Sequence, residues 1–188
     1  MKLIILIAAI IFLGFLSPID VGAQKGSKTY TVPDEFSFQY PSNWKLQEKE
    51  NRFTTIDASL KYGNNVVQMV FEGGNISDIG NPTDDEILNL LKAQIEKKDD
   101  GKVFESGMDK NAINNRTTPY VIGTYTIKPV FGGPFQMVVL ATAVHVNDNE
   151  LVLARYIAEQ NDFDKYLPKV KQVIKSISPL GNNTQETS

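Results

Sequence analysis

The chain of 188 residues contains no cysteine and a single histidine. The lack of cysteine excludes disulfide bridges, cysteine-ligated zinc, iron–sulfur clusters, thiol catalysis and a lipid-modified N-terminal cysteine. Clusters of one charge are also missing, because the 19 basic residues are interspersed with 22 acidic ones. Binding to nucleic acid and adhesion to anionic lipid both need a concentrated basic face. We therefore expect neither kind of partner.

One long apolar run is present, at the N-terminus. Lys2 precedes an uncharged, apolar run from Leu3 to Leu16, and the small residues 21–23 come before Gln24. This order is typical of a secretory signal peptide. The run has 14 residues, whereas a helix that spans a bilayer needs about 20. We predict a signal peptide over residues 1–23 and a secreted, extracytoplasmic protein. The alternative is a retained N-terminal segment that anchors the protein to the membrane, facing outside.

The remainder of the chain is long enough for one domain with a substantial core. Residues 24–29 are polar, and we predict a short flexible lead-in there. Residues 30–180 are predicted to form the domain. Residues 181–188 are polar again, and they are predicted to be a disordered tail.

Alternating apolar and polar residues predict that most of the domain is β-structure. Residues 135–146 are apolar on both faces, which is typical of a central strand covered on both sides. A Gly-, Asn- and Asp-rich segment over residues 73–82 is predicted to be a loop. The predicted strands cover residues 36–40, 44–46, 53–62, 66–71, 103–108, 119–127, 135–146 and 150–159.

Two helices are predicted from apolar residues at intervals of three and four. Thr83 and Glu86 have the spacing of a capping box, and Gly101 marks the end of the first helix. In the second stripe Pro168 would remove an internal hydrogen bond. We therefore predict a single turn at 162–167 and a main helix at 168–177. Together the elements predict an α+β fold, in which helices flank both faces of an antiparallel sheet as an α/β/α sandwich.

Two segments resemble a known family. The sequence FSFQYPSNWK at residues 36–45 resembles the opening signature of the PsbP-like family, an aromatic strand that runs into Tyr40, Pro41 and Trp44. Residues 163–177 resemble its closing helix, which ends in a serine, here Ser176, followed by an apolar residue.

The resemblance covers roughly residues 30–179 and implies an antiparallel sheet sandwiched by helices. Named members of the family are extrinsic lumenal proteins of photosystem II, and a structurally similar relative is a Ran-binding nuclear import factor. Many stand-alone prokaryotic members are exported. The photosynthetic role involves a basic N-terminal arm and metal-associated histidines. Here the lead-in is short and His145 is the only histidine, so that role is not carried over.

The candidate chemical groups favour structural roles. His145 has no histidine or cysteine partner, so we interpret it as a packed, hydrogen-bonded core residue and not as a base or ligand. Residues 148–150 (Asp-Asn-Glu) lack the ligand pattern of a calcium loop, and we interpret them as a hairpin turn. The acidic run at 84–86 is explained by helix capping. We expect no metal and no cofactor.

The chain contains no phosphate-loop, nucleophile-elbow or zinc-protease string. Three candidate N-glycosylation acceptors lie in predicted loops or the tail: Asn75, Asn115 and Asn182. The hypothesis that fits best is an exported, non-catalytic binding or accessory protein, whose partner is an unknown protein or envelope component. The alternatives are a carrier of a small apolar ligand and a hydrolase without a recognisable motif.

Overall fold

The computed structural model describes residues 26–32, 35–47, 58–62, 67–109, 116–130 and 132–180. The predicted signal peptide, the predicted disordered tail and the sequons at Asn115 and Asn182 lie outside these residues. None of the helices in the described ranges is both long and apolar enough to cross a bilayer.

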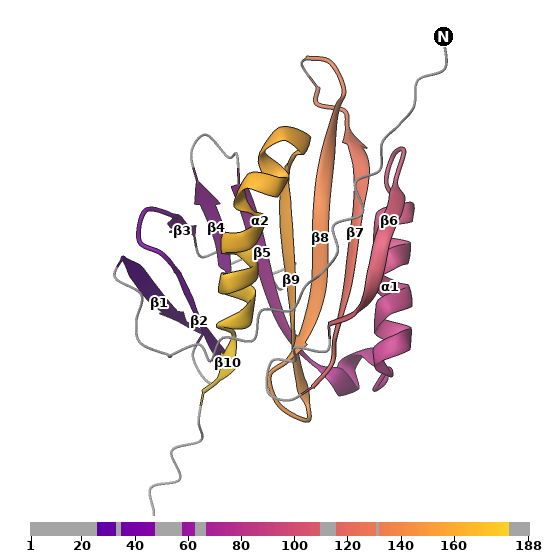
Figure 1. Cartoon of the computed structure of the whole chain (residues 1–188). Helices are drawn as coiled ribbons and strands as arrows, with labels where there is room; N and C mark the ends of the chain where they lie inside the picture. The colour runs from indigo at the N-terminus through magenta and orange to yellow at the C-terminus, as the bar shows by residue number, and fades with distance from the viewer. Residues whose placement is uncertain are drawn as a thin grey trace, which may run out of the picture.

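A seven-stranded sheet forms the centre of the molecule (Figure 1), and its strand order is β3-β4-β5-β9-β8-β7-β6. Every pair of neighbours is antiparallel. The strands are β3 (Lys45–Gln47), β4 (Ala58–Tyr62), β5 (Val67–Asn75), β6 (Lys102–Asp109), β7 (Thr118–Ile127), β8 (Phe135–His145) and β9 (Glu150–Glu159). From Val138 to His145, β8 is buried on both faces, which confirms the predicted central strand.

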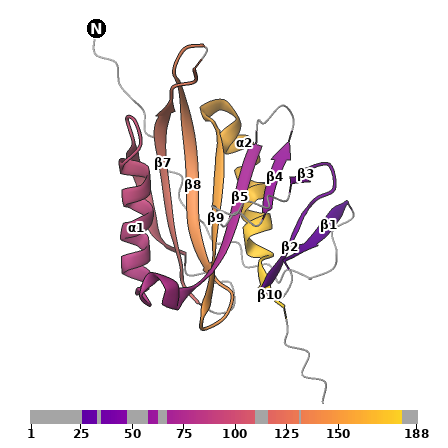
Figure 2. The same ribbon diagram turned by 180° about the vertical axis from the view of Figure 1, so that it is seen from behind.

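One helix lies on each face of this sheet (Figures 1 and 2). Helix α1 (Asp84–Glu96) packs on β7 and β6, and helix α2 (Gln160–Lys175) packs on the opposite face against β9, β5 and β8. The predicted capping box is present, since the Thr83 side chain accepts from the Glu86 N–H and the Glu86 carboxylate accepts from the Thr83 N–H. The predicted α/β/α arrangement is confirmed.

A second, smaller sheet was not predicted. Its strands β1 (Ser27–Thr31), β2 (Phe36–Pro41) and β10 (Ser178–Pro179) are ordered β1-β2-β10. Because β1 begins at Ser27, the prediction of a flexible segment is wrong for residues 27–29. Their polar side chains carry no periodic signal, and it is backbone pairing with β2 that makes them a strand.

The aromatic residues of β2 join the two sheets. Phe38 is fully buried and stacks on Phe71 of β5, with ring centroids 4.2 Å apart. Trp44, 3% exposed, fills the core below the turn that follows β2. This cluster also includes the inner face of α2.

Two elements, α2 and β5, extend well beyond their predicted bounds. Helix α2 runs without a break through Pro168. The lost hydrogen bond is tolerated because both halves of the helix bury apolar side chains, among them Phe163 and Val170, in one core. Strand β5 extends to Asn75, so the predicted loop is wrong for residues 73–75, which pair with residues 150–152 of β9. A short 3₁₀ helix, η1 (Ile76–Ile79), follows.

Ser176 connects α2 to the small sheet. Ser178 pairs with Ser37 in antiparallel register, which places Ser176 opposite Gln39. Ser176 has helical backbone angles (φ −87, ψ −3) and cannot continue the strand. Its hydroxyl supplies the missing partner instead, accepting from the Gln39 N–H at 2.8 Å while it donates to the Val173 carbonyl at 2.6 Å.

We expect Ser176→Ala to lower the free energy of unfolding by about 1–3 kcal/mol, because it leaves the partly buried Gln39 N–H without an acceptor. Chemical denaturation measures this change. Ser178→Ala is the matched control, since the Ser178 hydroxyl contacts only the Ser37 hydroxyl among the bonds described. Equal stabilities for the two variants would contradict the role given to Ser176.

Candidate functional site

His145 lies at the end of β8, below the first turn of α1. It is 9% exposed, and its Nε2 lies 2.8 Å from Asp84 Oδ1. The Thr117 hydroxyl donates to the other Asp84 oxygen at 2.7 Å. His145 is therefore packed and hydrogen-bonded, as predicted. Its partner was missed because Asp84 lies 61 residues away and helix capping already explained that residue.

The Asp84–His145 pair does not present a base to solvent. A catalytic histidine uses one ring nitrogen for its orienting carboxylate and the other for the substrate. Here Nε2 faces Asp84, and Nδ1 is buried. The pair links the N-terminus of α1 to the end of β8, which is a structural role.

The surroundings of Asp84 lower the pKa of its carboxyl group, and we expect this to make stability depend on pH. Burial raises the pKa of its carboxyl group, but the hydrogen bonds from Thr117 and His145 and the charges of His145 and Arg116 outweigh burial and leave the pKa below its ordinary 3.8. When the folded state lowers the pKa of a carboxyl group, the group stabilises that state at any pH above its ordinary pKa. This contribution disappears as the pH falls through the folded-state pKa.

We therefore expect Asp84→Asn to lower the free energy of unfolding by about 1 kcal/mol at neutral pH, with a difference from the unmodified protein that vanishes in acid below the lowered pKa. Denaturation across a pH series measures it. Asp85→Asn is the control, because Asp85 is exposed in the same helical turn. A difference that persists at low pH would show that Asp84 does not act through its charge.

The other acidic candidates do not converge either. Asp148 pairs with Arg116. Glu150 accepts from the Asn147 side chain at 2.6 Å, and the Asn149 N–H donates to Asn147 at 2.8 Å, which makes this segment a hydrogen-bonded turn, as predicted. Within the described ranges no three His, Asp or Glu side chains are placed to hold a metal ion.

The family-signature residues are structural. Tyr40 and Trp44 are 8% and 3% exposed, and the Trp44 N–H donates to the Pro41 carbonyl to close the turn after β2. Asn75 is exposed and caps η1 by accepting from the Ser77 N–H at 2.9 Å. It stays a predicted glycosylation acceptor.

The surface most suited to binding is the α1-side face of β9 and β5, which we call the open half of the sheet. Helix α1 covers β6, β7 and part of β8 on this face, and no helix of the described part lies over β9 and β5 (Figure 2). On the α2 side, the side chains of β9 are fully buried, each at most 1% exposed: Val152, Ala154, Tyr156 and Ala158. On the open half its side chains are only partly buried: Leu151, Leu153, Arg155 and Ile157.

An ion pair occupies the middle of the open half. The Arg155 guanidinium donates to the Glu72 carboxylate, and the two side chains are 31% and 20% exposed. In register, Arg155 lies between Val70 and Ala141. Burial raises the pKa of nearby Tyr125, although the charge of Arg155 opposes this. Because the two charges cancel, the centre of this face carries no net charge.

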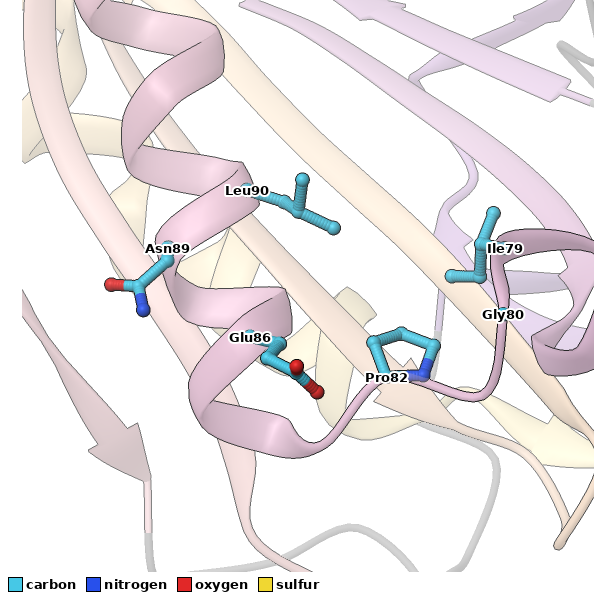
Figure 3. Close-up of a pocket in the computed structure, with 6 residues that line it drawn as sticks. All are labelled: Ile79, Gly80, Pro82, Glu86, Asn89 and Leu90. Carbon is cyan, nitrogen blue, oxygen red and sulfur yellow. The ribbon is translucent and has the colours of Figure 1, made fainter.

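Two exposed apolar side chains border the open half. Leu90 of α1 and Ile79 of η1 are 52% and 53% exposed. Figure 3 shows Leu90 projecting from α1 toward Ile79 across a hollow of about 440 Å³, which is lined by Ile79, Gly80, Pro82, Glu86, Asn89 and Leu90. The hollow is shallow, and its lining adds two apolar side chains, Leu90 and Ile79, to the α1 side of the molecule.

Sequence reasoning did not identify this surface. A signal existed, since one predicted helix between residues 83 and 101 is too narrow to cover a sheet of about seven strands. The strand order, which decides which strands that helix leaves uncovered, is not visible in a single sequence.

Comparison with known proteins places the fold. A protein-family model described as PsbP matches residues 25–178. No curated protein matches the chain in sequence. The solution structure of cyanobacterial PsbP (CyanoP) from Synechocystis sp. PCC 6803 is similar, with 12% identity, a TM-score of 0.60, and coverage of 88% of this chain and 99% of that one.

Two crystal structures are also similar. One, from Bacteroides thetaiotaomicron, has 12% identity and a TM-score of 0.52. The match covers 84% of this chain and 50% of the Bacteroides chain. The other is LpqN, involved in cell envelope biogenesis of Mycobacterium tuberculosis, with 8% identity, a TM-score of 0.50, and coverage of 87% of this chain and 89% of that one. At these identities the likeness is one of fold.

Proposed function

Because the chain belongs to the PsbP family, we propose that it is an extracytoplasmic, non-catalytic binding protein that docks on a membrane complex or another envelope component. The observation that carries the proposal is the open half of the sheet. This face has the partly buried Leu151, Leu153 and Ile157 of β9, and the exposed Leu90 of α1 and Ile79 of η1 add further apolar surface. An exposed apolar patch that continues the core is typical of a protein-docking surface.

The N-terminal apolar run and the environment of the histidine support the same proposal. A secretory signal would deliver the domain to the outer side of the membrane. The one histidine is held by Asp84 in a structural pair, which removes the most obvious general base. A small-ligand carrier is less well supported, because such proteins enclose most of the ligand surface and the hollow beside Leu90 is open.

Site-specific photo-crosslinking in the native host tests the proposal. A photoreactive residue replaces Leu153 in the open half or, as control, Val130, which is 91% exposed in the β7–β8 connection. We expect a crosslinked partner from position 153 only, in an extracytoplasmic fraction. Recovery of the protein in the cytosol, identical crosslinks from both positions, or substrate turnover abolished by one point mutation would each contradict the proposal.

A further inference from the structure

The geometry points to the kind of partner. We propose that the open half of the sheet binds an amphipathic α-helix of a partner protein, lying beside α1 over β9, with an acidic flank toward Lys45 and Lys61. The inference rests on the proposed function and names the partner's chemistry.

The spacing of the sheet favours a helix at this position. Helix α1 packs chiefly on β7, and β9 is the second strand from β7. Neighbouring strands lie about 4.8 Å apart, so β9 is about 10 Å from the line below α1. Packed helices have interaxial distances of about 8–10 Å. A second helix in contact with α1 would therefore lie over β9.

The backbone argues against an extended peptide as the occupant. Strand β9 pairs with β5 on one side and with β8 on the other, so its face offers no free ladder of N–H and C=O groups. An extended segment laid on this face would leave its own backbone groups without partners, whereas a helix satisfies them internally.

The apolar residues match one face of such a helix. Leu151, Leu153 and Ile157 form a row along β9, about 20 Å long at 3.3 Å per residue. A helix of about 13 residues has the same length. Leu90 projects from the flank of α1 toward Ile79 (Figure 3) and would pack against a helix added beside α1, which would also cover much of Ile79.

The charges orient the helix. Lys45 of β3 and Lys61 of β4 are direct register partners, and Lys61 also pairs with Gln68, which shares the face of Val70 and Glu72. Two positive charges thus lie side by side at the outer edge of the open half. On the inner edge stands Glu86, whose carboxylate caps α1. A helix with acidic residues on its outer flank is complementary to this arrangement.

Three synthetic peptides of about 16 residues test the inference, with helix formation checked by circular dichroism. The first has a leucine stripe and a glutamate flank, the second has lysine in place of those glutamates, and the third is a shuffled form of the first. Fluorescence anisotropy measures their binding to the full-length protein. We expect the glutamate peptide to bind, the lysine peptide to bind about tenfold more weakly, and the shuffled peptide not to bind.

Variants of the protein locate the site. The double exchange of Lys45→Glu and Lys61→Glu is expected to reverse the preference between the two charged peptides. Leu90→Asn is expected to weaken binding of the glutamate peptide about tenfold, because the apolar contact between Leu90 and the peptide is lost. Val130→Asn is the matched control and should have no effect. Equal binding of both charged peptides, or binding indifferent to Leu90→Asn, would overturn the inference.

Other occupants give distinct results. A dimer in sedimentation that Leu90→Asn dissolves would assign the surface to a second copy of the chain, and a small apolar molecule retained in native mass spectrometry would assign it to a ligand. Either result overturns the helix. If position 153 crosslinks to a partner but no peptide binds, the proposed function stands and the helical partner is refuted. If there is neither a crosslink nor peptide binding, the proposed function and the helical partner are both refuted.

Discussion

Replacing Phe71 by alanine is expected to lower the free energy of unfolding by about 3–5 kcal/mol, the largest effect of any single truncation considered. Phe71 is fully buried in β5 and stacks on Phe38 with an interplanar angle of 18°. The contact joins the large sheet to the small one. Alanine would leave a cavity between the two sheets that neither can close, because each is fixed by its own hydrogen bonds.

Such a loss is a large share of the ~5–15 kcal/mol by which domains are usually stable. Urea denaturation measures it, and Val130→Ala is the control because Val130 is 91% exposed. If the variant is too unstable to purify, Phe71→Leu keeps most of the volume and should lose less. A double-mutant cycle with Phe38→Ala isolates the stacking, for which we expect a coupling of about 1 kcal/mol. A Phe71→Ala variant as stable as the Val130→Ala control would contradict the packing described.

The features that the sequence predicts well are those that depend on residues close together in the chain. The capping box at Thr83 and Glu86, the apolar stripe of α1 and the two-faced strand β8 are all local patterns, and each is present. Pro168 shows the limit of local rules, because a helix-breaking residue remains inside α2 when the flanking turns share one core.

The features that sequence reasoning missed depend on pairing across the chain. Strand β1 is polar and becomes a strand only through β2. The His145–Asp84 bond joins residues that local patterns assign to separate roles. The open half of the sheet arises from strand order, since α1 and β6 follow β5 in the chain while β9 inserts beside β5. No single segment carries that information.

The second large effect is expected at Gly123 of β7. A Cβ atom at this position would lie 2.5 Å from the Lys102 carbonyl oxygen and 3.0 Å from a methyl group of Ile95. The carbonyl belongs to β6, which is held to β7 by its ladder and has a register shift between Val103 and Glu105 at this point. A backbone oxygen cannot rotate away as a side chain can, so β6 must move.

We expect Gly123→Ala to destabilise the protein by about 2–3 kcal/mol, since overpacking at a fixed backbone costs about this much. Gly74→Ala is the matched control, because Gly74 also lies in a strand and a Cβ there meets no atom within 4 Å. Alanine at Gly74 should be neutral or slightly stabilising, because it reduces the freedom of the unfolded chain. Thermal denaturation compares the two variants. If both behave alike, α1 and β6 do not approach β7 as closely as described, and the part of the sheet that α1 leaves open would have to be redrawn.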